Sequence, residues 1–217
     1  MDSPFPLLIA ATSLMIVPFL VVSLTAFVKI AVVLFLVRSA LGIQQTPPNL
    51  VLYGVTIVLT GYVMSPVIAA SFSAMTDGGT MTSLPDPSRW PELLRQGLEP
   101  VRDFLTRFTT PQDRAFFLSA AEEMHGSTAV VPTERDIFIL APAFVTAELT
   151  RAFEIGVMLY LPFIVVDLVI TNILTAMGMM MVSPTVISLP FKLLLFVAVD
   201  GWARLTHGLV TGYVPAG

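Results

Sequence analysis

Three long stretches without a charged side chain constrain the fold of this chain more than any other feature. They are residues 3–28, 50–76 and 168–191. A helix needs about 20 mostly apolar residues to cross the hydrocarbon of a bilayer, so each stretch is long enough for one crossing. Only 12% of the residues are charged, against roughly 25% in an ordinary soluble domain. The sequence therefore predicts a membrane protein.

The first two stretches predict a helical hairpin. The start of the chain lacks the basic residue and short apolar core of a cleavable signal, so we expect the first stretch to remain in the mature protein. Lys29 and Arg38 follow it, and Pro47 and Pro48 then punctuate a turn. Both charges near the turn are basic, so the positive-inside rule places the turn in the cytoplasm.

Residues 77–136 differ sharply in composition, because they hold six of the eleven basic and ten of the fifteen acidic residues. We expect a small helical domain on the extracytoplasmic side. Apolar residues at three- and four-residue spacing predict one amphipathic helix that Pro100 kinks or splits. These residues are Leu94, Leu98, Val101, Leu105 and Phe108. A second short helix is expected over 112–123.

The region from 137 to 176 is too long for one straight crossing and contains Pro142 and Pro162. A kinked helix or a pair of helices fits it better. A last apolar region, roughly 185–213, follows it and contains Pro190.

The predicted fold is an all-α membrane protein with two helical hairpins, made of four hydrophobic segments kinked by proline. A small helical extracytoplasmic domain separates the hairpins. The expected domains are residues 1–76, 77–136 and 137–217.

Seven charged residues lie in the apolar second half of the chain. They are Glu148, Arg151, Glu154, Asp167, Lys192, Asp200 and Arg204. Helical spacing allows local pairs of Glu148 with Arg151, Arg151 with Glu154, and Asp200 with Arg204. Asp167 and Lys192 have no such neighbour, so each is expected to find a distant partner within the chain or on another subunit. Arg204 and the earlier Lys29 are equally well interpreted as extending toward water at segment ends.

A methionine cluster lies in the turn of the second expected hairpin. It comprises Met177, Met179, Met180 and Met181 around Gly178. Methionine is flexible and apolar, so several copies of such a segment can close a hole and still be pushed aside. Gap filling between helices is the simpler interpretation of the cluster.

Small-molecule chemistry is poorly supported. The chain has no cysteine and only two histidines, His125 and His207, so no metal site is indicated by spacing. No phosphate-binding loop or nucleophile elbow is present. We therefore expect no catalytic residues and no cofactor. We also expect no nucleic-acid partner, because the net charge is −4 and the chain has no basic cluster.

Several motifs in one order resemble the FliP/SctR (YscR/HrcR-like) family of type III secretion export-apparatus proteins. They cover nearly all of the chain except residues 77–136. The motifs are residues 38–42, 46–49, 64–66, 140–153, 161–167, 177–182 and 189–202. Gln44-Gln45 before the two prolines, and the short segment ahead of the first helix, look more like the injectisome branch than the flagellar one. Ser183-Pro184 departs from the two prolines that the family often has there.

The resemblance implies a bacterial inner-membrane subunit that forms a pentamer. Its implied partners are FliQ/SctS-like and FliR/SctT-like subunits, the FlhB/SctU-like and FlhA/SctV-like export components, and unfolded secreted proteins in transit. It also implies that Met179, Met180 and Met181 form a gasket in a pore. Glu148, Asp167 and Lys192 would be buried polar positions that bridge subunits. In such assemblies the apolar segments can lie above the membrane plane.

Three functions remain to be weighed. The leading one is a pore-forming subunit that holds a protein secretion channel closed until substrate is threaded through it. A secondary transporter or proton channel, with Asp167 and Lys192 at its site, is the alternative that helices broken by proline favour. An intramembrane enzyme is a third, although no nucleophile and base can be placed.

Overall fold

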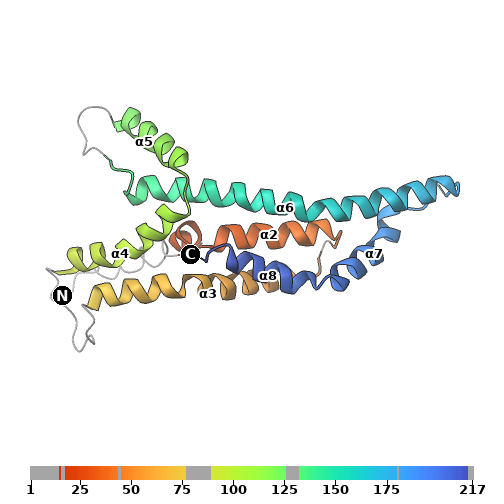
Figure 1. Cartoon of the computed structure of the whole chain (residues 1–217), viewed down its shortest axis with the longest axis horizontal. Coiled ribbons are helices and arrows are strands. Elements are labelled where there is room, and N and C mark those ends of the chain that lie inside the picture. The colour runs from red at the N-terminus through yellow and green to blue at the C-terminus, as the bar shows by residue number, and fades with distance from the viewer. Residues whose placement is uncertain are drawn as a thin grey trace, which may run out of the picture. The chain divides into compact units, whose positions relative to one another are not determined.

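The computed structural model describes residues 15, 18–43, 45–76, 89–125, 132–179 and 181–214. All regular structure in these residues is α-helical (Figure 1), which confirms the predicted all-α class. A short helix, Pro18–Leu24, comes first. The longer helices are α2 (Phe27–Ala40), α3 (Asn49–Thr76), α4 (Trp90–Arg107), α5 (Pro111–His125), α6 (Ile137–Ala176), α7 (Pro184–Ala198) and α8 (Gly201–Thr211).

The chain forms two compact units. Unit 1 comprises Met1–Val28 and Met64–Leu149, and unit 2 comprises Lys29–Val63 and Thr150–Gly217. The second part of α3, with α4, α5 and the start of α6, belongs to unit 1. The remaining helices and helix segments belong to unit 2. The division into residues 1–76, 77–136 and 137–217 concerns membrane topology and stays a prediction.

Among the residues that the structure describes, two helices, α3 and α6, are long and apolar enough to cross a membrane, and up to four spans result if each bent helix pair is one span. The stretch 3–28 was expected to be one crossing, but its helix breaks at Thr25 and Ala26. The Thr25 hydroxyl donates to the carbonyl of Val21 and accepts from the amide of Phe27. A threonine that bonds the backbone in this way bends a helix and caps the next one.

Helix α6 runs unbroken for 40 residues, so the alternative of two helices over 137–176 is wrong. Pro142 and Pro162 both lie inside it. Apolar helices tolerate proline because neighbouring groups satisfy the freed carbonyl. At 1.5 Å per residue, α6 is about 60 Å long, roughly twice the thickness of bilayer hydrocarbon. An upright α6 therefore extends well beyond one hydrocarbon layer.

Unit 1 packs the amphipathic α4 against the start of α6. The ring of Phe104 lies 5.6 Å from that of Phe144, and both side chains are buried. Helix α4 continues through Pro100, so the proline does not split it. The predicted register is partly wrong, because Leu93 is buried while Leu94 is 52% exposed. The second predicted helix of this region is observed as α5, which is slightly longer than expected.

Polar contacts on the surface of unit 1 hold the segment before α6 to α4 and α5. Arg135 contacts Glu99 at 3.3 Å and Asp103 at 2.7 Å. Arg114, at the start of α5, lies 3.5 Å from Glu134. Hydrogen bonds from Arg95 hold the pKa of the exposed Glu92 carboxyl below its ordinary value. Water screens exposed pairs of this kind, so each contributes little to stability.

Unit 2 is built around α2. Gly156 of α6 lies against Leu36 of α2, and a Cβ added at Gly156 would lie 2.3 Å from Leu36 Cδ1. A larger residue at this position would require the end of the Leu36 side chain to shift. A row of aromatic rings joins α6, α7 and α8, with centroid distances of 6.3 Å for Phe163 to Phe196 and 5.3 Å for Phe196 to Trp202.

The last apolar region is two helices bent by 59°, not one. Asp200, between α7 and α8, has a φ of 52°, in the left-handed region. The predicted ion pair of Asp200 with Arg204 assumed one continuous helix. Asp200 instead precedes α8 with a left-handed backbone, and the pair does not form within the described residues.

Candidate functional site

The methionine cluster occupies the turn that joins α6 to α7 (Figure 1). Gly178 has a φ of +74°. The amide of Met179 donates to the carbonyl of Leu174 at 2.9 Å, and the amide of Gly178 donates to that of Thr175 at 3.0 Å. This pair of bonds with a left-handed glycine is a Schellman motif, which ends a helix sharply. The turn therefore follows directly from the position of Gly178.

Two of the three described methionine side chains in the turn are mostly exposed. Met177 is 66% exposed, Met179 is 40% exposed and Met181 is 101% exposed. Met180 lies outside the described residues. A methionine that fills a gap between helices is buried in that gap. Gap filling within this chain therefore does not account for Met177 and Met181.

A compact polar cluster lies between α6 and α7, beyond the methionine turn. Lys192 Nζ is 2.6 Å from Asp167 Oδ2 and donates to the carbonyl of Ala40 at 3.3 Å. The Ser188 hydroxyl donates to Asp167 Oδ1 at 2.6 Å. Ser188 is fully buried, and the Lys192 side chain is 7% exposed against 34% for Asp167. Asp167 and Lys192, which lack a partner at helical spacing, are thus each other's partners.

This arrangement follows from the helices that carry the three side chains. Ser188 and Lys192 are four residues apart in α7, so they face the same neighbour. That neighbour is Asp167, about two and a half turns before the end of α6. Ala40 ends α2, where carbonyls lack helical partners and favour a cation. Within unit 2, the cluster ties α7 to both α6 and α2.

The other predicted polar residues lie elsewhere. Glu148 is fully buried in unit 1. Lys29 is 4% exposed, and its ammonium lies 3.5 Å from the ring centroid of Tyr213. The interpretation that Lys29 extends toward water is therefore wrong. Sequence reasoning missed this cation–π contact, because no spacing rule connects residues so far apart.

The proline turn joins α2 to α3. Arg38 donates to the carbonyl of Pro47 at 3.3 Å and also to Asn49 Oδ1. The carbonyl of Pro48 accepts from the amide of Val51 at 3.0 Å, which closes the first turn of α3. Arg38 thus holds the turn in place through these hydrogen bonds, in addition to any role in membrane orientation.

Long apolar helices, many exposed apolar side chains and a buried ion pair define a helical membrane protein. Residues 10–209 match the FliP family. The chain is 50% identical over 208 residues to Yop proteins translocation protein R of Yersinia pestis, covering 95% of both chains. It is 51% identical over 199 residues to the probable translocation protein y4yL of Sinorhizobium fredii, covering 91% of this chain and 88% of that one.

The chain therefore belongs to the FliP family. A flagellar biosynthetic protein FliP, from Pectobacterium carotovorum, is 43% identical over 95% of this chain and 77% of its own length. Similarity to the translocation proteins is higher, which confirms the predicted resemblance to the injectisome branch. Family and relatives together support a membrane component of a protein-secretion apparatus.

Proposed function

We propose that this protein is a core subunit of a type III secretion export gate, in which several copies bring their methionine turns together around a protein-conducting pore. The exposure of Met177, Met179 and Met181 is the observation that supports this most directly. Met177 and Met181 in particular are too exposed to be filling gaps in their own chain, and exposed apolar side chains grouped at a turn are typical of an interaction surface.

The chemistry of methionine suits a gate for polypeptides. A ring of thioethers excludes water and ions when closed, because it offers no fixed polar group. Each side chain has three rotatable bonds, so the ring deforms around side chains of any kind. The described residues of the turn carry no charge that would favour one substrate over another.

The polar cluster of Asp167, Ser188 and Lys192 supports the same proposal by fixing the base of the turn. It ties α7, which follows the turn, to α6, which precedes it. A gate needs flexible side chains on a firm backbone, since loose helices would leave the pore open. Asp167 retains 34% exposure of its side chain, so it also remains reachable by a neighbouring copy. Glu148 is enclosed by its own chain, and its role as an inter-subunit bridge has less support.

The proposal includes a bacterial inner-membrane location, a pentamer, and assembly with FliQ/SctS-like and FliR/SctT-like subunits. It also includes the two hairpins, with the turn at residues 46–49, including Pro47 and Pro48, in the cytoplasm and residues 77–136 on the opposite side. Export components of the FlhB/SctU and FlhA/SctV type, and unfolded secreted proteins, are the further proposed partners. The membership in the FliP family supports these assignments.

A leakage measurement tests the gate. Met179, Met180 and Met181 are replaced together by alanine in the full apparatus, and the passage of ions and small dyes across the inner membrane is measured. We expect increased leakage with normal amounts of assembled complex. Met124→Ala is the matched control, because Met124 is 84% exposed on α5 and lies outside the turn. Unchanged leakage in an intact complex would count against the gate.

A further inference from the structure

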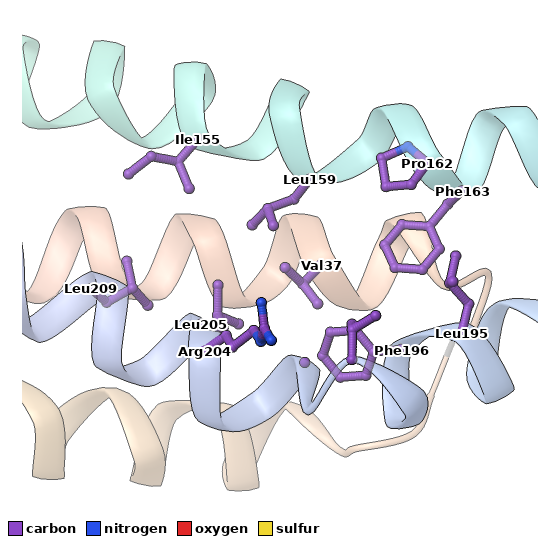
Figure 2. Close-up of a pocket in the computed structure, with 13 residues that line it drawn as sticks. Val37, Ile155, Leu159, Pro162, Phe163, Leu195, Phe196, Arg204, Leu205 and Leu209 are labelled. Carbon is purple, nitrogen blue, oxygen red and sulfur yellow. The ribbon is translucent and has the colours of Figure 1, made fainter.

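Unit 2 contains an apolar cavity of about 440 Å³ between α2, α6, α7 and α8 (Figure 2). Its size lies within the range of about 300 to 1,000 Å³ that is usual for ligand sites. The methionine turn takes no part in it. The lining side chains are almost all apolar, and they include Leu159 and Phe163 of α6, Leu195 and Phe196 of α7, and Leu205 and Leu209 of α8.

Arg204 is the one charged residue among the thirteen that line the cavity (Figure 2). It lies in the first turn of α8. Its guanidinium makes no ion pair or hydrogen bond with any described residue, and the lining contains no carboxylate. Asp200, four residues earlier, belongs to the bend and does not pair with it. Arg204 is exposed at the edge of the apolar cavity, and its guanidinium is therefore available to bind an anion from outside the chain.

We propose that the cavity binds one acyl chain of an anionic phospholipid, and that Arg204 binds the phosphate of its headgroup. The bilayer around a membrane protein supplies such molecules at high concentration. An acyl chain matches the apolar walls, because each buried methylene is favourable by about 0.8 kcal/mol. The planar guanidinium presents parallel donors that match phosphate oxygens.

The two halves of the site exclude simpler occupants. Free phosphate would satisfy Arg204 but would leave the apolar walls unused. A zwitterionic lipid such as phosphatidylcholine would fill the walls and carries a phosphate, but its choline cation offsets the attraction of that phosphate for the guanidinium. An anionic lipid uses both parts of the site without an offsetting cation, and it should be favoured over a zwitterionic lipid by about tenfold. The proposal does not depend on the export gate, since neither the methionines nor a second copy contributes to the cavity.

Trp202 provides a probe beside the cavity. Its ring lies 5.3 Å from that of Phe196, which lines the cavity. The chain has two tryptophans, so the change Trp90→Phe leaves Trp202 as the single fluorophore. The full chain with this change is reconstituted into phosphatidylcholine vesicles. A small, equal fraction of either brominated phosphatidylglycerol or brominated phosphatidylcholine is included, and bromine quenches only a nearby indole.

We expect stronger quenching by brominated phosphatidylglycerol than by brominated phosphatidylcholine, corresponding to about a tenfold preference. Arg204→Gln should abolish the preference, and Arg204→Lys should retain part of it because the charge remains. Arg107→Gln, which removes an exposed cation at the end of α4, should leave the preference unchanged. Equal quenching by the two lipids in the unaltered site would overturn the proposal. So would a preference that survives Arg204→Gln, or protection of Trp202 from both lipids by another copy or protein.

Discussion

Removal of the Lys192 ammonium is the sharpest test of how the methionine turn is held. In Lys192→Met, Asp167 keeps its hydrogen bond from Ser188 but loses a cation at 2.6 Å. Removal of one partner of a buried pair costs about 3 to 5 kcal/mol. Because the Asp167 side chain is 34% exposed, water stabilises part of the remaining charge. We therefore expect a loss of about 3 kcal/mol in the free energy of unfolding.

A double-mutant cycle isolates the interaction itself. Asp167→Asn alone leaves Lys192 buried with only the Ala40 carbonyl and a neutral amide, so it should also destabilise strongly. The double variant buries no unpaired charge and should cost less than the sum of the single changes, by about 2 kcal/mol. Denaturant titration of the detergent-solubilised chain, followed by circular dichroism, measures all four proteins. Lys192→Arg keeps the charge and is the control. Additive losses within about 0.5 kcal/mol would refute the pairing.

Three further results are expected. In Lys192→Glu, two acids face each other, so the assembled complex should be lost on a native gel. The additional change Asp167→Lys restores an ion pair but leaves a carboxylate beside the Ala40 carbonyl, which is also an acceptor, so only part of the complex should return. Gly156→Val should destabilise by about 1 to 3 kcal/mol through the clash with Leu36, and Leu36→Ala should relieve it; no loss on thermal unfolding would disprove the close approach. Asp200→Gly should stabilise by up to about 1 kcal/mol, because glycine adopts a positive φ without strain; a lower melting temperature would contradict a left-handed Asp200.

The sequence predicted the helical class and the location of the methionine turn well. Charge-free stretches are local signals, and local signals survive in the folded chain. Pro142 and Pro162 suggested a pair of helices over 137–176, but proline in an apolar helix does not have to end it. At Thr25 the error was the opposite one, because a helix was expected to continue and it breaks. A hydroxyl is a weak signal for a helix break, and Thr25 causes this one through two contacts with the backbone.

The polar contacts could be predicted only in outline. Asp167 and Lys192 were recognised as needing distant partners, yet spacing alone does not connect residues that are 25 positions apart. The Lys29 contact with Tyr213 spans most of the chain and gave no signal at all. The proposed lipid site could not be predicted for the same reason, because residues far apart in the sequence form the cavity where α2, α6, α7 and α8 converge.

Cross-linking between copies tests the central claim most directly. The chain has no cysteine, so Met181→Cys introduces a single thiol at a fully exposed position of the turn. A short thiol-specific cross-linker is applied to membranes that contain the assembled complex, with Met124→Cys as the matched exposed control. If methionine turns meet around one axis, Met181→Cys should give dimers and higher multimers while the control gives none. A Met181→Cys chain that stays monomeric within an intact complex would contradict the account.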